Sequence, residues 1–492
     1  MVTRKIFPPL CAAALACAVS YYGLFALEQL GLAPPPRIFA ALPLAAGIFL
    51  AFFKIAGAKK IPFYAAGFCL GLALGINAHS AAYRAALPPG GLPAGEIRGL
   101  EGVLLEDPRS VQARGQGMGR LALAKIYGKN GIQVIPGGKA AQVRVIFDEE
   151  ALPRIVDFGR KSVLYVEGSF SGAFFRAEGV HVLSPPPPIE RARTAFRLTL
   201  LEKFSRHEWG FLAQAVLLGV RDNLDTELAR AFTVSGCAHV LALSGMHLGV
   251  IAGLFSLLLK KPLGLKGASL SGALLVSLYV YLVGPQASLI RSLIMYLTGV
   301  LVILKGFPRR AEAILGGAFI IQLLLFPSSG RELSFALSYL ALLGLLTLGP
   351  WIYELIRGTV PRPVAAPLSA STGAFLITAP LSAFCFGVLH PVGILAALIM
   401  GPLITLFMVL ALAWLFVEAL FPAAAVLLAA LLSFVYLILK AVSAVAGLFP
   451  AITIRDARAA LIVSLAVMTL IYVGQKKLAL MRKRLEPFDQ GA

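Results

Sequence analysis

Apolar and polar positions divide the chain into three regions of different character. Long apolar stretches near 9–28, 38–56 and 61–82 are each long enough to cross a bilayer. The segment 94–183 instead alternates apolar and polar residues in short runs such as AAQVRVIF and SVLYVEGSF, separated by turn-forming KNG and PGGK. Nine more membrane-length stretches follow, at about 238–259, 268–284, 287–304, 310–327, 332–350, 367–389, 391–417, 423–447 and 457–474. We therefore predict a polytopic α-helical membrane protein of about twelve transmembrane helices with an inserted extracytoplasmic all-β domain.

Composition and charge support this class of protein and predict its orientation. The 492 residues are 58% hydrophobic and only 14% charged, and the mean hydropathy is +0.83, which is far above what a soluble core needs. The net charge of +20 is in large part an orientation signal, because lysine and arginine accumulate in short cytoplasmic loops. Every basic cluster falls on one side of the membrane if both termini are cytoplasmic, and we predict that orientation.

Changes in composition divide the chain into five segments. Residues 1–88 hold three N-terminal transmembrane helices, 94–183 the all-β domain, 184–210 a proline-rich linker and an amphipathic helix, 211–475 the main transmembrane domain, and 476–492 a basic cytoplasmic tail. The N-terminus also resembles a signal peptide, but its apolar run continues through Leu27, so we favour an uncleaved first helix. The segment 211–220 is too short to span and is expected to be re-entrant or buried in protein.

The predicted all-β domain carries a basic stripe. About five short strands in 90 residues favour an OB-fold-like barrel, and seven basic residues lie from Arg109 to Arg144 without one Asp or Glu between them. Such a stripe with an aromatic side chain suits a phosphate backbone and a stacked base. A solvated face, or one touching anionic lipid, is the alternative. The DNA-binding candidates are Arg114, Arg120, Lys125, Tyr127 and Lys129.

The linker helix is expected to lie along the membrane surface. The sequence RARTAFRLTLLEKFSRHEWGF follows the tetraproline SPPPP and places apolar residues near helical spacing, with five basic side chains on the remainder. Basic side chains of such a helix reach the lipid headgroups.

The stretch CAHVLALSGMHLGVIAGLF places several polar groups inside an apolar segment. Imidazoles at this depth cost free energy unless they are paired or face water, so His239 and His247 are candidate site residues. On a continuous helix they lie about 80° apart, and no nearby carboxylate completes a metal site, so we predict no metal and no cofactor. Either each histidine bonds a backbone carbonyl, or both line a pore opened by Ser244 and Gly245.

Arg291, in GPQASLIRSLIMYL, lies about five residues into its apolar stretch. It either snorkels outward or offers a fixed cation to a passing anion, since a guanidinium matches phosphate oxygens. The chain contains no Walker A loop and no G-x-S-x-G elbow, and a rhomboid-like Ser/His dyad is the one enzymatic alternative. We therefore predict no enzymatic activity and no catalytic residue.

Several of these motifs together resemble the ComEC family of natural-competence DNA channels. FTVSGCAHVLALSGMHLGVIAGLF is similar to the start of that family's competence domain, and it follows LLGVRDNLDTELARAF, as in the family. GPQASLIRSLIMYL and ELSFALSYLALLGLL resemble two further family stretches, and three leading helices before an OB-like region are its usual front end. Val220 departs from the pattern, because an acidic residue is expected before the arginine.

The resemblance implies passage of one DNA strand through the inner membrane during transformation. His239, Ser244, Gly245, His247 and Arg291 are carried over as DNA-channel candidates. Many members carry a nuclease domain with an H-x-H-x-D-H motif, which is absent here, so the resemblance implies that either a separate nuclease removes the other strand or that strand is removed in another way. The other implied partners are single-stranded DNA, membrane lipids, a cytoplasmic ATP-driven helicase or translocase, and a periplasmic DNA receptor. The competing hypothesis is a transporter or exporter of another anionic substrate, with the OB-like domain as a docking module.

Overall fold

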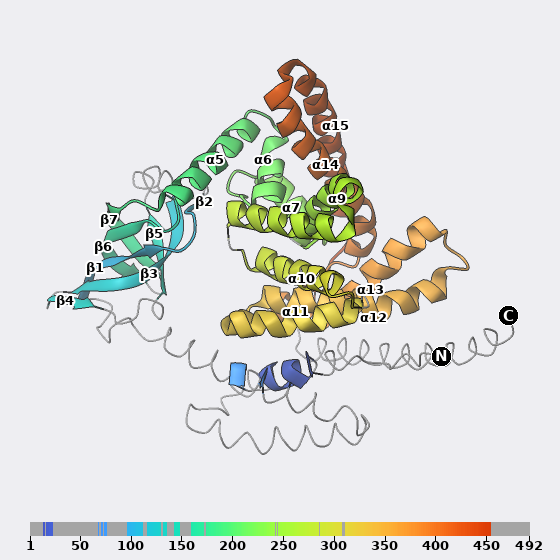
Figure 1. Ribbon diagram of the computed structural model, residues 1–492, viewed down its shortest axis with the longest axis horizontal. Coiled ribbons are helices and arrows are strands. Elements are labelled where there is room, and N and C mark those ends of the chain that lie inside the picture. The colour runs from blue at the N-terminus through green and yellow to red at the C-terminus, as the bar shows by residue number, and fades with distance from the viewer. Residues whose placement is uncertain are drawn as a thin grey trace.

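The computed structural model describes a small β structure, most of the C-terminal helices and short helical pieces near the N-terminus. These are residues 13–14, 16–22, 67, 70–71, 73–75, 96–111, 116–128, 131–134, 142–147, 159–171, 174–241, 243, 245–284, 286–307 and 310–453. The expected spans at 38–56 and 457–474 lie outside them, as do most of those at 9–28 and 61–82. Helix α5 leads from the β structure to the helices (Figure 1).

Seven strands form the β structure, and five of them close on one another. Its path runs β1–β6–β7–β5–β3, and an additional β1–β3 pairing completes the ring, while β2 and β4 extend β3. The β5–β7 pairing is parallel, and the other pairings of the ring are antiparallel. The closed path fits the predicted OB-like barrel. The strands are β1 (Ile97–Leu104), β2 (Arg109–Val111), β3 (Gln116–Gly128), β4 (Gly131–Val134), β5 (Gln142–Phe147), β6 (Val163–Ser171) and β7 (Phe174–Ser184).

The interior of the barrel follows from the alternation in the sequence. In QVRVIF of β5, Val143, Val145 and Phe147 are buried while Gln142 and Arg144 are exposed, because successive side chains point to opposite faces of a strand. Gly168 marks a bulge between β6 and β7: its φ is +156°, and an added Cβ would lie 1.9 Å from the carbonyl oxygen of Arg176. Only glycine tolerates that combination.

A buried ionic cluster joins the barrel to α5 (Pro188–Ser205). Glu190 has no exposed surface and accepts hydrogen bonds from Arg160 Nε at 2.9 Å and Arg193 Nε at 3.0 Å. Lys161 Nζ lies 2.6 Å from the same carboxylate. Arg193 also bonds Asp107, which follows β1, with an Nη2–Oδ1 distance of 2.5 Å. Because each charge has a direct counter-charge, the cluster avoids the cost of unpaired buried ions.

The same two arginines hold the last turn of α9 (Gly245–Val283). Arg160 donates to the carbonyl oxygen of Tyr281 at 3.2 Å, and Arg193 donates to that of Leu282 at 2.9 Å. The final carbonyls of a helix have no partner within the helix and carry a partial negative charge, so cations stabilise them. The guanidinium of Arg160 also lies 4.8 Å from the centre of the Tyr281 ring. The cluster therefore links barrel, α5 and membrane helices at one point.

This cluster changes the interpretation of α5. The sequence predicted basic side chains that reach the lipid headgroups, but Arg193 is buried and binds Glu190 and Asp107 instead. Near the other end of α5, Phe204 is buried beside Trp209 and Trp414, with ring centres at 6.1 and 5.9 Å. Lys203 forms an ion pair with Glu418 of α14. Packing against other elements on both ends therefore orients this helix.

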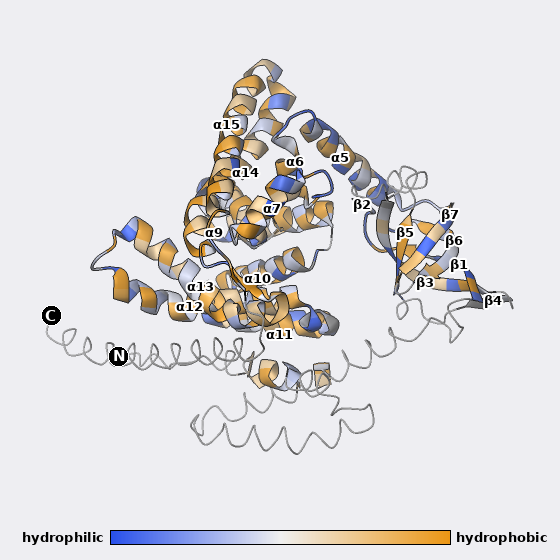
Figure 2. Ribbon diagram, turned by 180° about the vertical axis from the view of Figure 1, so that it is seen from behind, coloured by the Kyte–Doolittle hydropathy of each residue, from blue (hydrophilic) through white to orange (hydrophobic). Residues whose placement is uncertain are grey.

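The helical part consists of packed pairs of antiparallel helices, with α12 against α13 and α14 against α15. Figure 2 shows hydrophobic residues over most of these helices, whereas α5 is largely hydrophilic. The remaining elements are α6 (Gly210–Ala213), η6 (Gln214–Leu218), α7 (Thr226–Val234), α8 (Ala238–Leu241), α10 (Ala287–Leu304), α11 (Ala311–Leu325), η7 (Pro327–Arg331), α12 (Leu333–Ile356), α13 (Arg362–Phe386), β8 (Val388–Leu389), α14 (Gly393–Leu420), α15 (Pro422–Ala446) and β9 (Ile452–Thr453).

Five of the described helices are long and apolar enough to cross a membrane: α9, α12, α13, α14 and α15. Two shorter apolar helices, Ser288–Leu304 and Ala311–Leu325, match two further expected spans. Helix α9 corresponds to the expected pair 238–259 and 268–284, because Gly264 has φ +65° and ψ −178° and interrupts the helical geometry after Pro262. A mostly helical membrane protein with a β-barrel-like domain is thus confirmed, and the count of about twelve stays a prediction.

We predict that Glu190→Gln destabilises the protein by about 3–5 kcal/mol, because it leaves Arg160 and Arg193 buried beside a neutral amide. The matched control is Glu202→Gln, which breaks an exposed pair with Arg206 on the same helix and is expected to cost less than about 1 kcal/mol. Denaturant unfolding of the purified protein measures both. If both substitutions lowered the free energy of unfolding equally, the buried cluster would contribute no more to stability than a surface ion pair.

The same carboxylate makes stability depend on pH. Burial alone raises the pKa of Glu190, but hydrogen bonds from Arg160 and Lys161 outweigh it and lower the pKa to about 2 from an ordinary 4.5. A depressed pKa in the folded state stabilises the protein above the unfolded value, and this contribution is lost as pH falls through the folded value. We expect the difference in unfolding free energy between wild type and Glu190→Gln to be full above about pH 5 and to shrink toward pH 2. A difference independent of pH would contradict this assignment.

Candidate site in the membrane bundle

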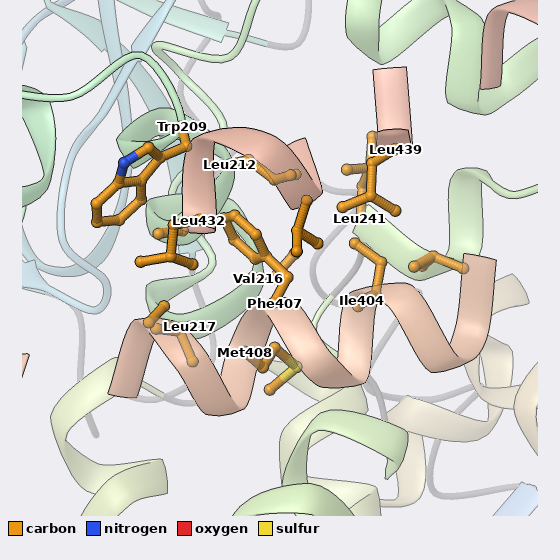
Figure 3. Packing of buried hydrophobic residues seen from close by; sticks show 14 of the residues in the cluster. Trp209, Leu212, Val216, Leu217, Leu241, Ile404, Phe407, Met408, Leu432 and Leu439 are labelled. Carbon is orange, nitrogen blue, oxygen red and sulfur yellow. The ribbon is translucent and has the colours of Figure 1, made fainter. Parts of the chain in front are cut away.

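A break in the helical backbone follows the short segment that the sequence predicted to be too short to span. Helix α6 passes into the π-helix η6, which ends at Gly219 in the left-handed conformation with φ +69°. All five residues of η6 are buried, and Figure 3 shows Val216 and Leu217 packed near Phe407 and Met408 of α14. The segment is therefore enclosed by protein. Short π-helical turns of this kind are frequent at functional sites.

Two other breaks meet this one. A Cβ added to Gly219 would lie 2.3 Å from Nε2 of Gln286, in the loop between α9 and α10, and 2.4 Å from Cδ1 of Leu243, between α8 and α9. Gly284, at the start of the α9–α10 loop, has φ +107°. Three interruptions of the apolar helices thus converge on Gly219. Irregular backbone at membrane depth occurs where it is buried in protein or lines a water-filled path.

The histidine segment is not one continuous helix. Helix α8 ends at Leu241 and α9 begins at Gly245, so the expected 80° separation of His239 and His247 on one helix is wrong. His239 is exposed, whereas His247 has no exposed surface. Ser244 lies outside the described residues. The break follows from the local sequence, because Ser244 and Gly245 are weak helix formers next to each other.

Gly245 and His247 face different neighbours. A Cβ added to Gly245 would lie 3.1 Å from Oγ of Ser292 on α10, so the glycine permits close approach of two helices. His247 lies within electrostatic reach of Arg221, in the loop after η6, and of His239. Arg221 is thus a candidate site residue that was not predicted from the sequence, although it lies in the family motif LGVRDN.

Arg291 belongs to a second polar group. Its residue exposure is 4%, and Nε and Nη1 have no hydrogen-bond partner among the described residues. It therefore does not snorkel outward. Its electrostatic neighbours are Tyr339, Glu332 and Tyr22, not the groups around His247. Within the part of the chain that the structure describes, no three His, Cys, Asp or Glu side chains form a possible metal site.

On the barrel, the basic stripe is partly neutralised. Arg120 makes a bidentate pair with Glu106, with Nε–Oε1 and Nη2–Oε2 distances of 3.1 and 3.0 Å. Lys125 Nζ lies 2.9 Å from Oε1 of Glu101, and the Tyr127 hydroxyl donates to Oε2 of Glu101 at 2.7 Å. These hydrogen bonds, first that from Lys125, lower the pKa of Glu101. Arg114 and Lys129 lie outside the described residues.

Tyr127 lies at one end of an aromatic row that crosses the outer face of the barrel. Its ring meets that of Tyr165 edge-on at 4.9 Å, and Tyr165 stacks on His181 with centres at 6.2 Å. The hydroxyl of Tyr165 reaches Gly99 of β1, where an added Cβ would lie 2.9 Å from it. Sequence reasoning missed Tyr165 and His181, although both occupy outward positions of alternating strands. Only the β6–β7 register, which pairs these two residues, reveals the row.

The profile of the family described as Competence protein matches residues 216–479 of the chain, which include the helix breaks and Arg291. ComE operon protein 3 of Bacillus subtilis (strain 168) is 32% identical over 174 residues, covering 34% of this chain and 21% of that protein. An uncharacterized protein of Aquifex aeolicus (strain VF5) is 32% identical over 197 residues, covering 39% of this chain and 45% of that one.

The aligned regions thus span less than half of either relative's length. No solved structure matches the chain. The family profile nevertheless covers more than half of the 492 residues and coincides with the motifs that carry the sequence resemblance. The chain therefore belongs to the Competence protein (ComEC) family.

Proposed function

We propose that this protein passes one strand of DNA through the inner membrane during natural transformation. Its family supports a role in DNA uptake in competence, and its apolar helices support a membrane location. The observation that carries the finer proposal is the convergence of three helix breaks on Gly219. A hydrated polymer can cross the membrane only along a path that is lined by hydrogen-bonding groups, because lipid tails offer none. Interrupted helices expose backbone N–H and C=O groups that can line such a path.

The barrel supplies a first contact for the strand outside the membrane. Bases of single-stranded DNA stack on aromatic rings irrespective of sequence, and Tyr127, Tyr165 and His181 offer a continuous row. The ion pairs of Arg120 and Lys125 with carboxylates reduce the net positive potential of this face. Base stacking, more than phosphate attraction, therefore contributes the binding free energy here.

The barrel also holds a defined position relative to the path. Arg160 and Arg193 bind the last carbonyls of α9, immediately before the α9–α10 break that meets Gly219. A strand leaving the barrel thus reaches the first membrane loop within a short distance. Both termini lie in the cytoplasm in this proposal, where an ATP-driven helicase or translocase pulls the strand. A periplasmic receptor delivers the DNA, and the complementary strand stays outside.

Deletion of the gene in a competent host is expected to abolish transformation and leave surface attachment of DNA normal. Wild-type protein restores transformation, and Gly219→Ala restores at most about a tenth of it, because the residue is held at φ +69°, where a side chain costs about 1–2 kcal/mol, and the ends of the Gln286 and Leu243 side chains must also move. Transformation frequency and the amount of protein in the membrane are measured together.

Gly253→Ala is the matched control, because nothing lies within 4 Å of its added Cβ. It should restore transformation fully. Normal transformation of the deletion strain would reject the proposal and favour transport of another anionic substrate. Full rescue by Gly219→Ala would show that the meeting point of the breaks does not matter for uptake.

The aromatic row is tested by binding of a fluorescent single-stranded oligonucleotide to the full chain in nanodiscs. We expect Tyr127→Ala and Tyr165→Ala each to weaken binding by about 1–3 kcal/mol, the typical loss for one stacked base. Phe196→Ala removes an exposed ring of α5 outside the row and should leave the affinity unchanged. Equal effects of all three substitutions would contradict stacking on this face.

A further inference from the structure

A group of buried polar side chains lies where the helical turn at 16–22 meets α10, α11 and α12. Tyr22, Met295 and Tyr339 pack in one cluster, and Met295 is one turn beyond Arg291 on α10. The hydroxyl of Tyr339 donates to Oε1 of Gln322 on α11 at 3.0 Å. Four segments that are distant in sequence thus bring a cation, two phenols and an amide together.

Several donors of this group are unsatisfied. Three buried atoms have no hydrogen-bond partner among the described residues: Nε and Nη1 of Arg291 and the hydroxyl oxygen of Tyr22. The carboxylate within electrostatic reach, Glu332, is exposed, and no ion pair joins it to Arg291 within the described part of the chain. A buried guanidinium without an acceptor costs several kcal/mol. Such a group is retained where an anion binds it.

We propose that Arg291 and Tyr22, oriented by the Tyr339–Gln322 pair, bind a phosphodiester of the DNA strand. A guanidinium offers two parallel N–H groups to two phosphate oxygens, and one cation balances the single charge of a phosphodiester. The phenol adds a neutral donor, which lets the phosphate leave again as the strand advances. The assignment of the phosphodiester to DNA rests on the proposed function. The ability of Arg291 and Tyr22 to bind a phosphodiester is inferred from their buried donors alone.

The position of the group favours a strand coming from the barrel over a lipid headgroup. Arg291 lies about 6 Å along α10 from its first residue, and Gln322 about 5 Å from the last residue of α11, both at the end of the bundle near the barrel. Arg120 of the barrel lies within electrostatic reach of Glu332, as Arg291 does. With exposures of 4%, 1% and 8%, Arg291, Gln322 and Tyr339 face the protein interior and not the lipid.

The experiment compares two probes on the full chain in phosphatidylcholine nanodiscs. One is a fluorescent twelve-nucleotide oligothymidylate, and the other is the same oligomer with uncharged methylphosphonate linkages. Arg291→Gln should raise the dissociation constant of the phosphodiester probe about tenfold and that of the methylphosphonate probe less than twofold. Tyr22→Phe, which keeps the cation and the ring, should give a smaller loss of about threefold with the same selectivity.

Arg357→Gln is the matched control, because it removes an equal charge from an exposed, ion-paired arginine immediately after α12. It should change neither affinity. The site is overturned if Arg291→Gln changes the affinity for both probes equally, or changes neither. In either case the proposed function still stands, provided that the wild-type protein binds the phosphodiester probe. Loss of the Arg291 effect when phosphatidylglycerol replaces phosphatidylcholine would assign the site to lipid and also overturn it. Failure of wild type to bind either probe would reject the proposed function together with the site.

Discussion

The ionic cluster around Glu190 is the interaction on which the arrangement of the molecule depends. The fully buried carboxylate of Glu190 pairs with both Arg160 and Arg193, Asp107 adds the second negative charge, and the two arginines donate to carbonyls in the last turn of α9. Burial of the two arginines depends on the carboxylates of Glu190 and Asp107 beside them. Apolar packing is weakly directional. It stabilises the barrel and the helical bundle, but it does not fix the orientation of the barrel relative to the bundle. Charge pairing at fixed geometry supplies that orientation.

Two polar groups within the bundle follow from the same constraint. Lipid cannot hydrogen-bond to backbone or cations, so each irregular or charged element must find its partners within protein or along a hydrated path. At Gly219 three broken segments meet, because the side chains of Gln286 and Leu243 pack against this glycine. Arg291 instead lies near the phenols of Tyr22 and Tyr339, whereas the next residue of α10, Ser292, contacts Gly245. The described bundle thus has two distinct polar groups, one around the breaks that meet at Gly219 and one around Arg291.

Hydrophobic runs and strand alternation were sufficient to predict the membrane helices and an OB-like barrel, because burial of apolar faces depends on local pattern. The family, too, was recognisable from FTVSGCAHVLALSGMHLGVIAGLF and is confirmed. The Glu190 cluster was not predictable, because its members lie at positions 107, 160, 190 and 193 and meet only after the barrel has closed. Likewise, the aromatic row requires the register of β6 on β7, and a helix period assumed through Ser244 placed His239 and His247 wrongly.

Helix α5 has a mechanical consequence. Its 18 residues form a rod about 27 Å long that is fixed at one end by the ionic cluster and at the other by Phe204 and the Lys203–Glu418 pair. Under the proposed function, a force that pulls on a strand bound to the barrel is transmitted through these contacts to α9, next to the α9–α10 break, and to α14, which packs against η6. Both helices adjoin the segments that meet at Gly219, so tension on the strand would act on the segments that are proposed to form its path.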